Sequence, residues 1–366
     1  MDELLLVVNA GSSSLKLSII AADDGATVDT ATIENWDGDD DDGALAAFLH
    51  GHHVGTVAHR VVHGGSGHTG PVVLDDATEA AIAALAPLAP LHQGRAIAGI
   101  NAARRVAPEA VAVACFDTAF HTTIPAAAAT YAVPAVWRER WGLRRFGFHG
   151  LSHQWASRRA AELLGRPLGE LAMITCHLGA GASLCAVDDG VSVDTTMGFT
   201  PLEGLVMATR SGSVDPGLLT WLLRQGVSLD ELEDGLERQG GLVALCGTDD
   251  MRRLLLDCER GAGPASEAFD VYVHRLCREA GGMVAALGRL DALVFTGGVG
   301  ERAPVVRAAV AAKLSYLGVA LDLVANTTAT SDAVLSAPGS AVATVVVTAR
   351  EDLEIARQTA WLLTPP

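Results

Sequence analysis

The chain has 366 residues, 49% of them hydrophobic and 5% aromatic, and it carries a formal net charge of −17 at pH 7. This length exceeds the size at which one core usually stops growing, so we expect two domains, and a chain rich in Ala, Val, Leu and Gly is typical of an α/β protein. The negative charge argues against nucleic acid and acidic membranes as partners, and any anionic substrate must be held by local Arg and Lys side chains.

The N-terminus and the cysteines indicate a cytoplasmic protein. The first residues include no basic region and no signal cleavage site, and no apolar run reaches the roughly 18 residues that span a bilayer. The cysteines form no C-x-x-C pair and lack metal-ligand spacing. Three of them lie in strongly apolar runs, and we therefore expect reduced core residues at Cys115, Cys176, Cys185, Cys246, Cys258 and Cys277.

The first predicted element is a pair of strands joined by a loop of small residues. Apolar residues 4–8 lead to Asn9, small residues occupy 10–14, and apolar and polar side chains then alternate over 15–19, which predicts a half-buried second strand. The small loop can approach an anion closely, Asn9 offers an oxygen to a magnesium ion or water, and Lys16 offers a point charge. Taken alone, the stretch fits an ordinary serine-rich hairpin equally well.

The next segments combine an acidic run, a histidine cluster and a strand. Residues 37–43 (DGDDDDG) predict a solvated loop, because the alternating ligands and closing Glu of a calcium site are missing. The histidines at 50, 52 and 53 are interpreted as a surface cluster rather than a metal site. Residues 56–63 predict a strand carrying His59 and Arg60, and strand alternation places Arg60 and Val62 on the same face.

A carboxylate follows the next buried strand. Residues 77–106 predict helix interrupted at Pro87 and Pro90, and residues 110–116 predict a buried strand that leads into Asp117. In α/β folds, catalytic groups lie at the carboxyl ends of such strands. Further along, His149 and His153 have the spacing of zinc ligands on a helix that ends near Gly165, but the glutamate of H-E-x-x-H is absent, so zinc is not predicted.

Near the middle of the chain the opening plan is repeated. Residues 172–177 predict a strand, 178–183 a small-residue loop and 184–187 a returning strand, so that His177 takes the place of Asn9. A third glycine-rich turn, at 295–301, follows a predicted strand and precedes a predicted helix over 304–317. The repeat indicates two related domains that each lend a phosphate loop to one cleft.

The segment between the last two turns is irregular. Residues 194–217 are predicted to be neither core nor helix, and Arg210 is their only cation. Asp215 and Pro216 predict the N-cap and first residue of a helix. The chain closes with a predicted strand over 341–348 and a predicted helix over 353–363.

The sequence resembles the acetate kinase family, which comprises acetate and propionate kinases. The motifs that carry the resemblance are VNAGSSSLK (8–16), HRVVHGG (59–65), FDTAFH (116–121), RRFGFHGLSH (144–153), HLGAGAS (177–183), MGFTPLEGLVMATRSGSVDPG (197–217), TGGVGE (296–301) and AREDLEIAR (349–357). The resemblance implies an α/β fold of two duplicated actin-like (ribonuclease H-like) domains with an ATP cleft between them. Residues 1–119 and 352–366 would form the N-terminal domain, and 120–351 the C-terminal nucleotide-binding domain.

The implied reaction is ATP + acetate ⇌ ADP + acetyl phosphate, with Mg²⁺. A carboxylate nucleophile is already ionised at pH 7, so the reaction needs positioning and cationic groups rather than a strong base. The resemblance implies catalytic roles for Arg60, Asp117, His149 and Arg210, and an acetate site formed by Arg60, Val62, Leu91, Phe148 and Pro201. Asn9 and Glu351 would hold magnesium, largely through water. Contacts with ATP are implied for Lys16, Thr175, Cys176, His177, Leu178, Gly179, Asp250, Met251, Arg252, Gly298, Val299, Gly300, Glu301 and Arg302.

Several positions depart from the family pattern. Ala180 replaces the usual Asn of a phosphate loop, Ser66 replaces Glu, and Arg302 and Arg350 replace polar Asn. These changes affect the expected rate more than the reaction type. Val62 in place of alanine favours acetate over propionate, by about 1–3 kcal/mol. The alternatives are a propionate or short-chain acyl kinase, or a catalytically weak nucleotide-binding module. The resemblance also implies a homodimer.

Overall fold

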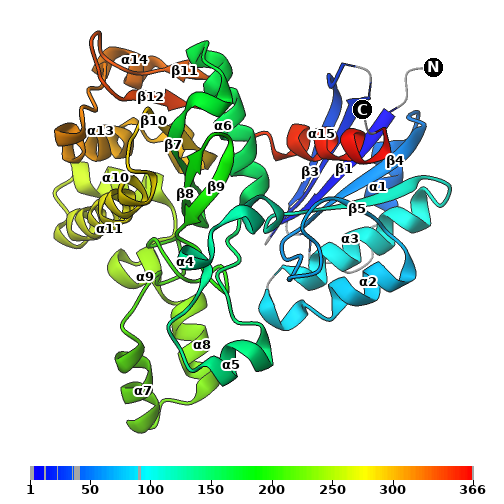
Figure 1. Cartoon of the computed structure of the whole chain (residues 1–366), viewed down its shortest axis with the longest axis horizontal. Helices are drawn as coiled ribbons and strands as arrows, with labels where there is room; N and C mark the ends of the chain where they lie inside the picture. Colours follow the sequence, from blue (N-terminus) through cyan, green and yellow to red (C-terminus); the bar gives the residue numbers. More distant parts are fainter. Residues whose placement is uncertain are drawn as a thin grey trace. The chain divides into compact units, whose positions relative to one another are not determined.

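The computed structural model describes residues 4–11, 14–22, 24–34, 36, 42–89 and 92–364 (Figure 1). The chain divides into two compact units: unit 1 is Met1–Thr122, Phe148–Trp155 and Arg350–Pro366, and unit 2 is Thr123–Gly147 and Ala156–Ala349. This division differs from the predicted domain boundaries chiefly at Phe148–Trp155. That segment, which includes the start of helix α6 (Gly150–Leu164), belongs to unit 1.

Unit 1 is built on a six-stranded sheet. Its strands are β1 (Leu4–Ala10), β2 (Ser14–Ala21), β3 (Thr27–Glu34), β4 (Val54–Val61), β5 (Val72–Val73) and β6 (Val111–Phe116). Its helices are α1 (Asp42–Leu49), α2 (Asp76–Ala83), α3 (Gln93–Val106) and α15 (Glu351–Leu363), with short 3-10 turns η1 (Ala86–Leu88) and η2 (Ala119–Thr123).

The sheet order of unit 1 is β3-β2-β1-β4-β6-β5, and β1, β4 and β6 are parallel. Successive residues of a strand face opposite sides of the sheet. Leu6 and Val8 therefore pack against α1 and α3, whereas Leu5 and Val7 pack with Ile355 of α15. Full burial of such side chains contributes about 1.5–3 kcal/mol each. The parallel strands are thus covered by helices on both faces.

The predicted opening hairpin is confirmed, because β1 and β2 pair antiparallel with Asn9 opposite Lys16. The second strand is more deeply buried than predicted, since Ile20 packs into the cluster that α15 covers. The helix predicted over 77–106 is confirmed as α2 and α3, separated by η1. Pro90 and residues 37–41 of the acidic run lie outside the described residues.

Unit 2 contains a second six-stranded sheet. Its strands are β7 (Ala172–Leu178), β8 (Ala182–Asp188), β9 (Val191–Thr195), β10 (Ala292–Thr296), β11 (Ala333–Val334) and β12 (Ala343–Val346). Its helices, apart from the later part of α6, are α4 (Ala126–Ala129), α5 (Ala135–Trp141), α7 (Pro216–Arg224), α8 (Leu229–Glu237), α9 (Gly241–Cys246), α10 (Met251–Glu259), α11 (Gly263–Leu287), α12 (Gly297–Arg302), α13 (Pro304–Lys313) and α14 (Leu323–Thr328), with 3-10 turns η3 (Leu168–Glu170) and η4 (Ser315–Leu317).

The two sheets share one topology, which confirms the duplication read from the sequence. In unit 2 the order is β11-β12-β10-β7-β8-β9, with β7, β10 and β12 parallel and β8, β9 and β11 antiparallel to their neighbours. Strands β7, β8, β9, β10, β11 and β12 thus correspond to β1, β2, β3, β4, β5 and β6. Helix α11 packs against β7, β8 and β9 (Figure 1).

Three details of unit 2 differ from the sequence predictions. The third glycine-rich turn is itself the short helix α12, and the helix predicted to reach residue 317 ends at Lys313, followed by η4. The irregular segment at 194–217 contributes to the core, because Met197, Leu205 and Met207 are fully buried. Asp215 and Pro216 cap and begin α7 as predicted.

In the part of the chain that the structure describes, no helix is both long enough and apolar enough to cross a bilayer. The six cysteines are free thiols: Cys115, Cys176 and Cys185 are buried, whereas Cys246, Cys258 and Cys277 are half-buried rather than core residues.

Candidate active site

Four polar residues meet in unit 1 where its parallel strands end. Asn9 is the penultimate residue of β1, Arg60 lies near the end of β4, and Asp117 directly follows β6. Parallel neighbours bring their carboxyl ends to one edge of the sheet, which is where α/β folds place ligands. Glu351 joins them as the first residue of α15.

Arg60 is the centre of this polar cluster. Its Nε and Nη2 atoms donate to Oδ1 and Oδ2 of Asp117 at 3.0 and 2.6 Å, which is a bidentate ion pair. Its Nη1 donates to Asn9 Oδ1 at 3.2 Å and lies 3.5 Å from Glu351 Oε2. Asn9 Nδ2 in turn donates to Glu351 Oε2 at 2.9 Å. Each member therefore fixes the orientation of the next.

Burial and charge act in opposite directions on this pair. Burial lowers the pKa of the Arg60 guanidinium, but Asp117 and Glu351 together raise the pKa above its usual value, so Arg60 stays protonated. Burial raises the pKa of Asp117, and the adjacent guanidinium of Arg60 opposes that rise. Asp117 is 1% exposed, so its charge depends on Arg60 rather than on water.

Asp117 also holds the turn that carries His149. The backbone of His149 hydrogen-bonds to the Asp117 carboxylate, and the Gly150 N–H donates to the Asp117 carbonyl at 2.9 Å. His149 has φ +56°, a left-handed conformation that is uncommon for a residue other than glycine. The His149 and His153 rings lie 6.5 Å apart, and the described residues contain no group of three or more His, Cys, Asp or Glu that could hold a metal.

The residues expected to contact the acyl group are only partly placed. Val62 is buried, but β4 ends at Val61, so strand alternation does not extend to Val62 and cannot assign it to the face of Arg60. Phe148 is buried, and its ring packs edge-on against His63 at 5.4 Å. Leu91 lies outside the described residues.

In unit 2 the structure brings together two of the glycine-rich segments. Thr296 of β10 pairs with His177 of β7, and a Cβ on Gly297 would lie 2.8 Å from the Leu178 carbonyl oxygen, so only glycine fits there. Gly298 is exposed, Val299 and Glu301 are half-buried, and Gly300 is buried in α12. The side chains of Thr175, Cys176 and Leu178 are fully buried. Among the β7 residues, His177 is therefore the one with an accessible side chain, and Gly179 follows it in the turn.

The remaining residues expected to bind nucleotide lie on α10, α12 and β2. Asp250 is the N-cap of α10, and its carboxylate accepts from the backbone and guanidinium of Arg252, which is largely exposed. Met251 is buried behind them. Arg302 is exposed at the end of α12, and Lys16 is exposed on β2 opposite Asn9. Asp250 and Arg252 are thus paired with each other, and their contact with ATP stays a prediction.

Arg210 differs from Arg60 in its electrostatic surroundings. Its Nη1 donates to the carbonyl of Pro201, a buried residue, at 2.7 Å. Burial lowers the pKa of Arg210, and the more distant charge of Glu237 opposes that shift. Across the described ranges no carboxylate lies within ion-pair distance of Arg210. Among the residues that the structure describes, this half-buried cation has no anionic partner, which is the arrangement expected where an anionic ligand binds.

Two supporting groups escaped the sequence analysis. Glu203 accepts from Tyr131 Oη at 2.6 Å and from Arg145 Nη2 at 2.8 Å, and this network braces the segment that carries Arg210. Arg307 is almost fully buried and donates to the Gly300 carbonyl at 2.8 Å, which fixes the end of α12. Arg145 and Glu203 lie in motifs that carry the family resemblance, whereas Tyr131 and Arg307 do not.

The sequence and structure both have close counterparts. The family model described as the Acetokinase family matches residues 49–357. An acetate kinase of Leifsonia xyli subsp. xyli is 46% identical over 97% of both chains, and one of a Synechococcus species is 49% identical over 83% of this chain and 75% of its own. The structure matches an acetate kinase of Porphyromonas gingivalis (TM-score 0.90, 32% identity, 99% and 100% coverage) and a propionate kinase of Francisella tularensis (TM-score 0.90, 34% identity, 97% and 98% coverage).

Proposed function

The chain belongs to the acetokinase family, and from this membership we propose that it transfers the γ-phosphoryl group of ATP reversibly to acetate, giving acetyl phosphate and ADP. It is a phosphotransferase with a carboxyl group as acceptor. The observation that carries the proposal is the polar cluster of Asn9, Arg60, Asp117 and Glu351, fixed by mutual hydrogen bonds at the ends of three parallel strands.

The residues of the chain suit this chemistry. Acetate is already ionised, so no base is needed to remove a proton from it. The protein has to orient the acetate carboxylate and the ATP phosphates, and to offset the negative charge on the phosphoryl group being transferred. We assign orientation of the carboxylate to Arg60, and stabilisation of the phosphoryl oxygens to His149 and Arg210. Asp117 acts as a positioning residue, because it holds both the Arg60 fork and the His149 backbone.

The donor set fits a magnesium ion. Asn9 and Glu351 supply amide and carboxylate oxygens, the ligands that Mg²⁺ prefers, and their side chains are joined by a 2.9 Å hydrogen bond. Two protein ligands are enough, because Mg²⁺ usually keeps several waters and binds substrate phosphates. When bound, the ion supplies positive charge that offsets the negative charge of the ATP phosphates.

Purified protein with ATP, Mg²⁺ and acetate is expected to form acetyl phosphate, measured as the hydroxamate. Pyrophosphate in place of ATP is expected to give none, because Gly298 and Val299 are small and leave room for a nucleoside. Activity with pyrophosphate alone would overturn the choice of donor. Nucleotide binding without acetyl phosphate would instead identify a nucleotide-binding module of the same fold.

The acyl preference rests on Val62. Val62→Ala is expected to shift the ratio of kcat/KM values toward propionate by about fourfold, since a buried methylene is worth about 0.8 kcal/mol. Both acids are to be measured in both proteins. Val61→Ala, one residue earlier and packed against Ile82 and Phe116, is the matched control, and its ratio should not move. An unchanged ratio in Val62→Ala removes Val62 from the acyl pocket and favours the propionate or short-chain acyl alternative.

We also infer a homodimer from helix α7. None of the α7 residues is buried. Its large apolar side chains therefore face outward: Leu218 is 43% exposed and Trp221, one turn later, is 55% exposed. Exposed apolar surface of this kind marks an interface, and a second copy of the chain is the proposed occupant. Trp221→Glu is expected to produce monomers in sedimentation velocity. Trp361→Glu, at an equally exposed position on α15, should leave the dimer intact, and monomeric wild-type protein would contradict the inference.

The cytoplasmic location is proposed on chemical grounds. Free thiols persist where the glutathione pool keeps cysteines reduced, and all six cysteines are free.

A further inference from the structure

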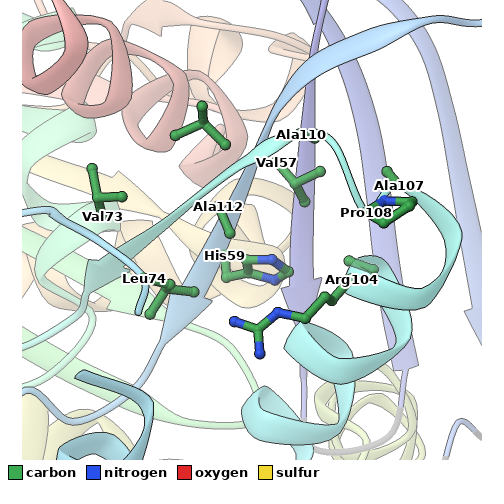
Figure 2. Close-up of a pocket in the computed structure, with 11 residues that line it drawn as sticks. Val57, His59, Val73, Leu74, Arg104, Ala107, Pro108, Ala110 and Ala112 are labelled. Carbon is green, nitrogen blue, oxygen red and sulfur yellow. The ribbon is translucent and has the colours of Figure 1, made fainter. Parts of the chain in front are cut away.

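A cavity of about 250 Å³ lies in unit 1, between β4, β6 and the carboxyl-terminal end of α3 (Figure 2). His59 of β4 contributes to its wall. Because neighbouring residues of a strand face opposite sides of the sheet, His59 points away from the side that Arg60 faces. The cavity is therefore separated by the sheet from the polar cluster of the proposed active site.

The ring nitrogens of His59, in the wall of the cavity, are available for hydrogen bonding to a ligand. The residue is 2% exposed, its ring stands among the lining side chains in Figure 2, and neither ring nitrogen has a hydrogen-bond partner among the described residues. Burial, and then the charge of Arg104, lower the pKa of His59 to about 3, so the ring is neutral at pH 7. A neutral imidazole offers one N–H and one lone pair, and buried polar groups of this kind are normally satisfied.

The rest of the wall sets the charge and polarity of a ligand. Apart from His59 and Arg104, the lining side chains are those of Ala, Val, Leu and Pro. Arg104 Nη1 donates to Glu79 Oε2 at 3.1 Å and Nη2 donates to Glu79 Oε1, so its charge is already paired. A charged ligand would lose its hydration without gaining an ionic partner.

We propose that this cavity binds a small uncharged molecule with a compact apolar body and one hydroxyl group that hydrogen-bonds to His59. An apolar cavity of about 150 Å³ is large enough for benzene, so this one has room for a substituted ring. The site goes beyond the proposed kinase activity, because none of its residues takes part in that reaction.

Phenol and toluene are matched probes, since they have nearly the same size and differ in the hydroxyl. Each is titrated into the full chain without ATP or acetate, and binding is followed by calorimetry. Wild-type protein is expected to bind both saturably, and phenol about three- to tenfold more tightly, the range expected of one hydrogen bond. Absence of saturable binding, or equal affinities, overturns the proposal.

Two variants locate the binding. Ala107→Leu places a larger apolar side chain in the lining at a half-buried position, and should weaken both probes at least tenfold. His59→Met should leave toluene unchanged and abolish the advantage of phenol. Retained phenol preference in His59→Met, or unchanged affinities in Ala107→Leu, place the probes elsewhere and contradict the site. Circular dichroism checks the fold, and neither readout depends on kinase activity.

Discussion

Arg210→Met is expected to lower kcat/KM for acetate by about two to three orders of magnitude, while Tm stays within about 2 °C of wild type. The activity is lost because a charge-assisted bond to an anion in a closed site is among the larger single terms in catalysis. Stability is retained because Arg210 bonds to the Pro201 carbonyl and to no carboxylate in the described structure, so its removal leaves no charge uncompensated.

The measurement is a comparison of kcat/KM and Tm across three variants. Arg210→Lys keeps the charge without the planar fork and should recover part of the activity. Arg253→Met, at an exposed position paired with Asp257, is the matched control and should change neither quantity. Near-normal turnover in Arg210→Met would exclude this arginine from the site, and a large loss of Tm would assign it a structural role.

Arg60→Met is expected to lower kcat/KM for acetate by a similar factor and also to lower Tm by several degrees. The variant leaves Asp117, which is 1% exposed, without the cation that compensates its charge. Breaking a buried ion pair from one side costs about 3–5 kcal/mol. Arg60→Met and Arg210→Met are therefore distinguished by their Tm values rather than by their kcat/KM values.

The pH dependence of Arg60→Met has a definite sign. Without the guanidinium, burial and then the charge of Glu351 raise the pKa of Asp117 above that of the unfolded chain, and the His149 backbone hydrogen bond opposes the rise only in part. A carboxyl group with a raised pKa stabilises the fold when protonated, and that contribution is lost as pH rises through the folded-state pKa. The Tm difference from wild type should therefore shrink as the pH is lowered toward the ordinary range of aspartate.

A double variant tests the cause of that loss. Adding Asp117→Asn to Arg60→Met replaces the unpaired charge with a neutral group and should restore much of the lost Tm without restoring activity. If the double variant is no more stable than Arg60→Met, the buried charge is not the source of the instability.

Asn9 and Asp117 could be predicted as site residues because each lies at the end of a predicted strand. Arg60 lay in the middle of the strand predicted over 56–63, and its role was implied by the family resemblance. The duplicated sheet was predictable from a repeated strand-loop-strand plan. The side on which Val62 lies could not be predicted by alternation, because alternation holds only while the strand lasts and β4 ends at Val61. The depth at which Thr175 is buried depends on helices far along the chain, so periodicity could not reveal it.

The supporting networks could not be read from local patterns at all. Tyr131 and Glu203 are 72 residues apart, and their hydrogen bond exists only once the chain has folded. Arg307 is charged and would be assigned to the surface by composition, yet it is 1% exposed, because it replaces missing backbone partners at the end of α12. A buried arginine such as Arg307 could be predicted only from a structure that shows which backbone carbonyls have no hydrogen-bond donor within the backbone.

The shared topology has a consequence for how the protein behaves when concentrated. Each sheet has one edge made of a two-residue strand, β5 or β11, too short to act as a template for a strand of another molecule. The opposite edges, β3 and β9, are longer. β3 carries Asp29 and Glu34, and such charges oppose pairing with an identical strand. Self-association through β-pairing is therefore confined to the longer edges and is opposed by charge at β3, so neutralising Asp29 should promote aggregation.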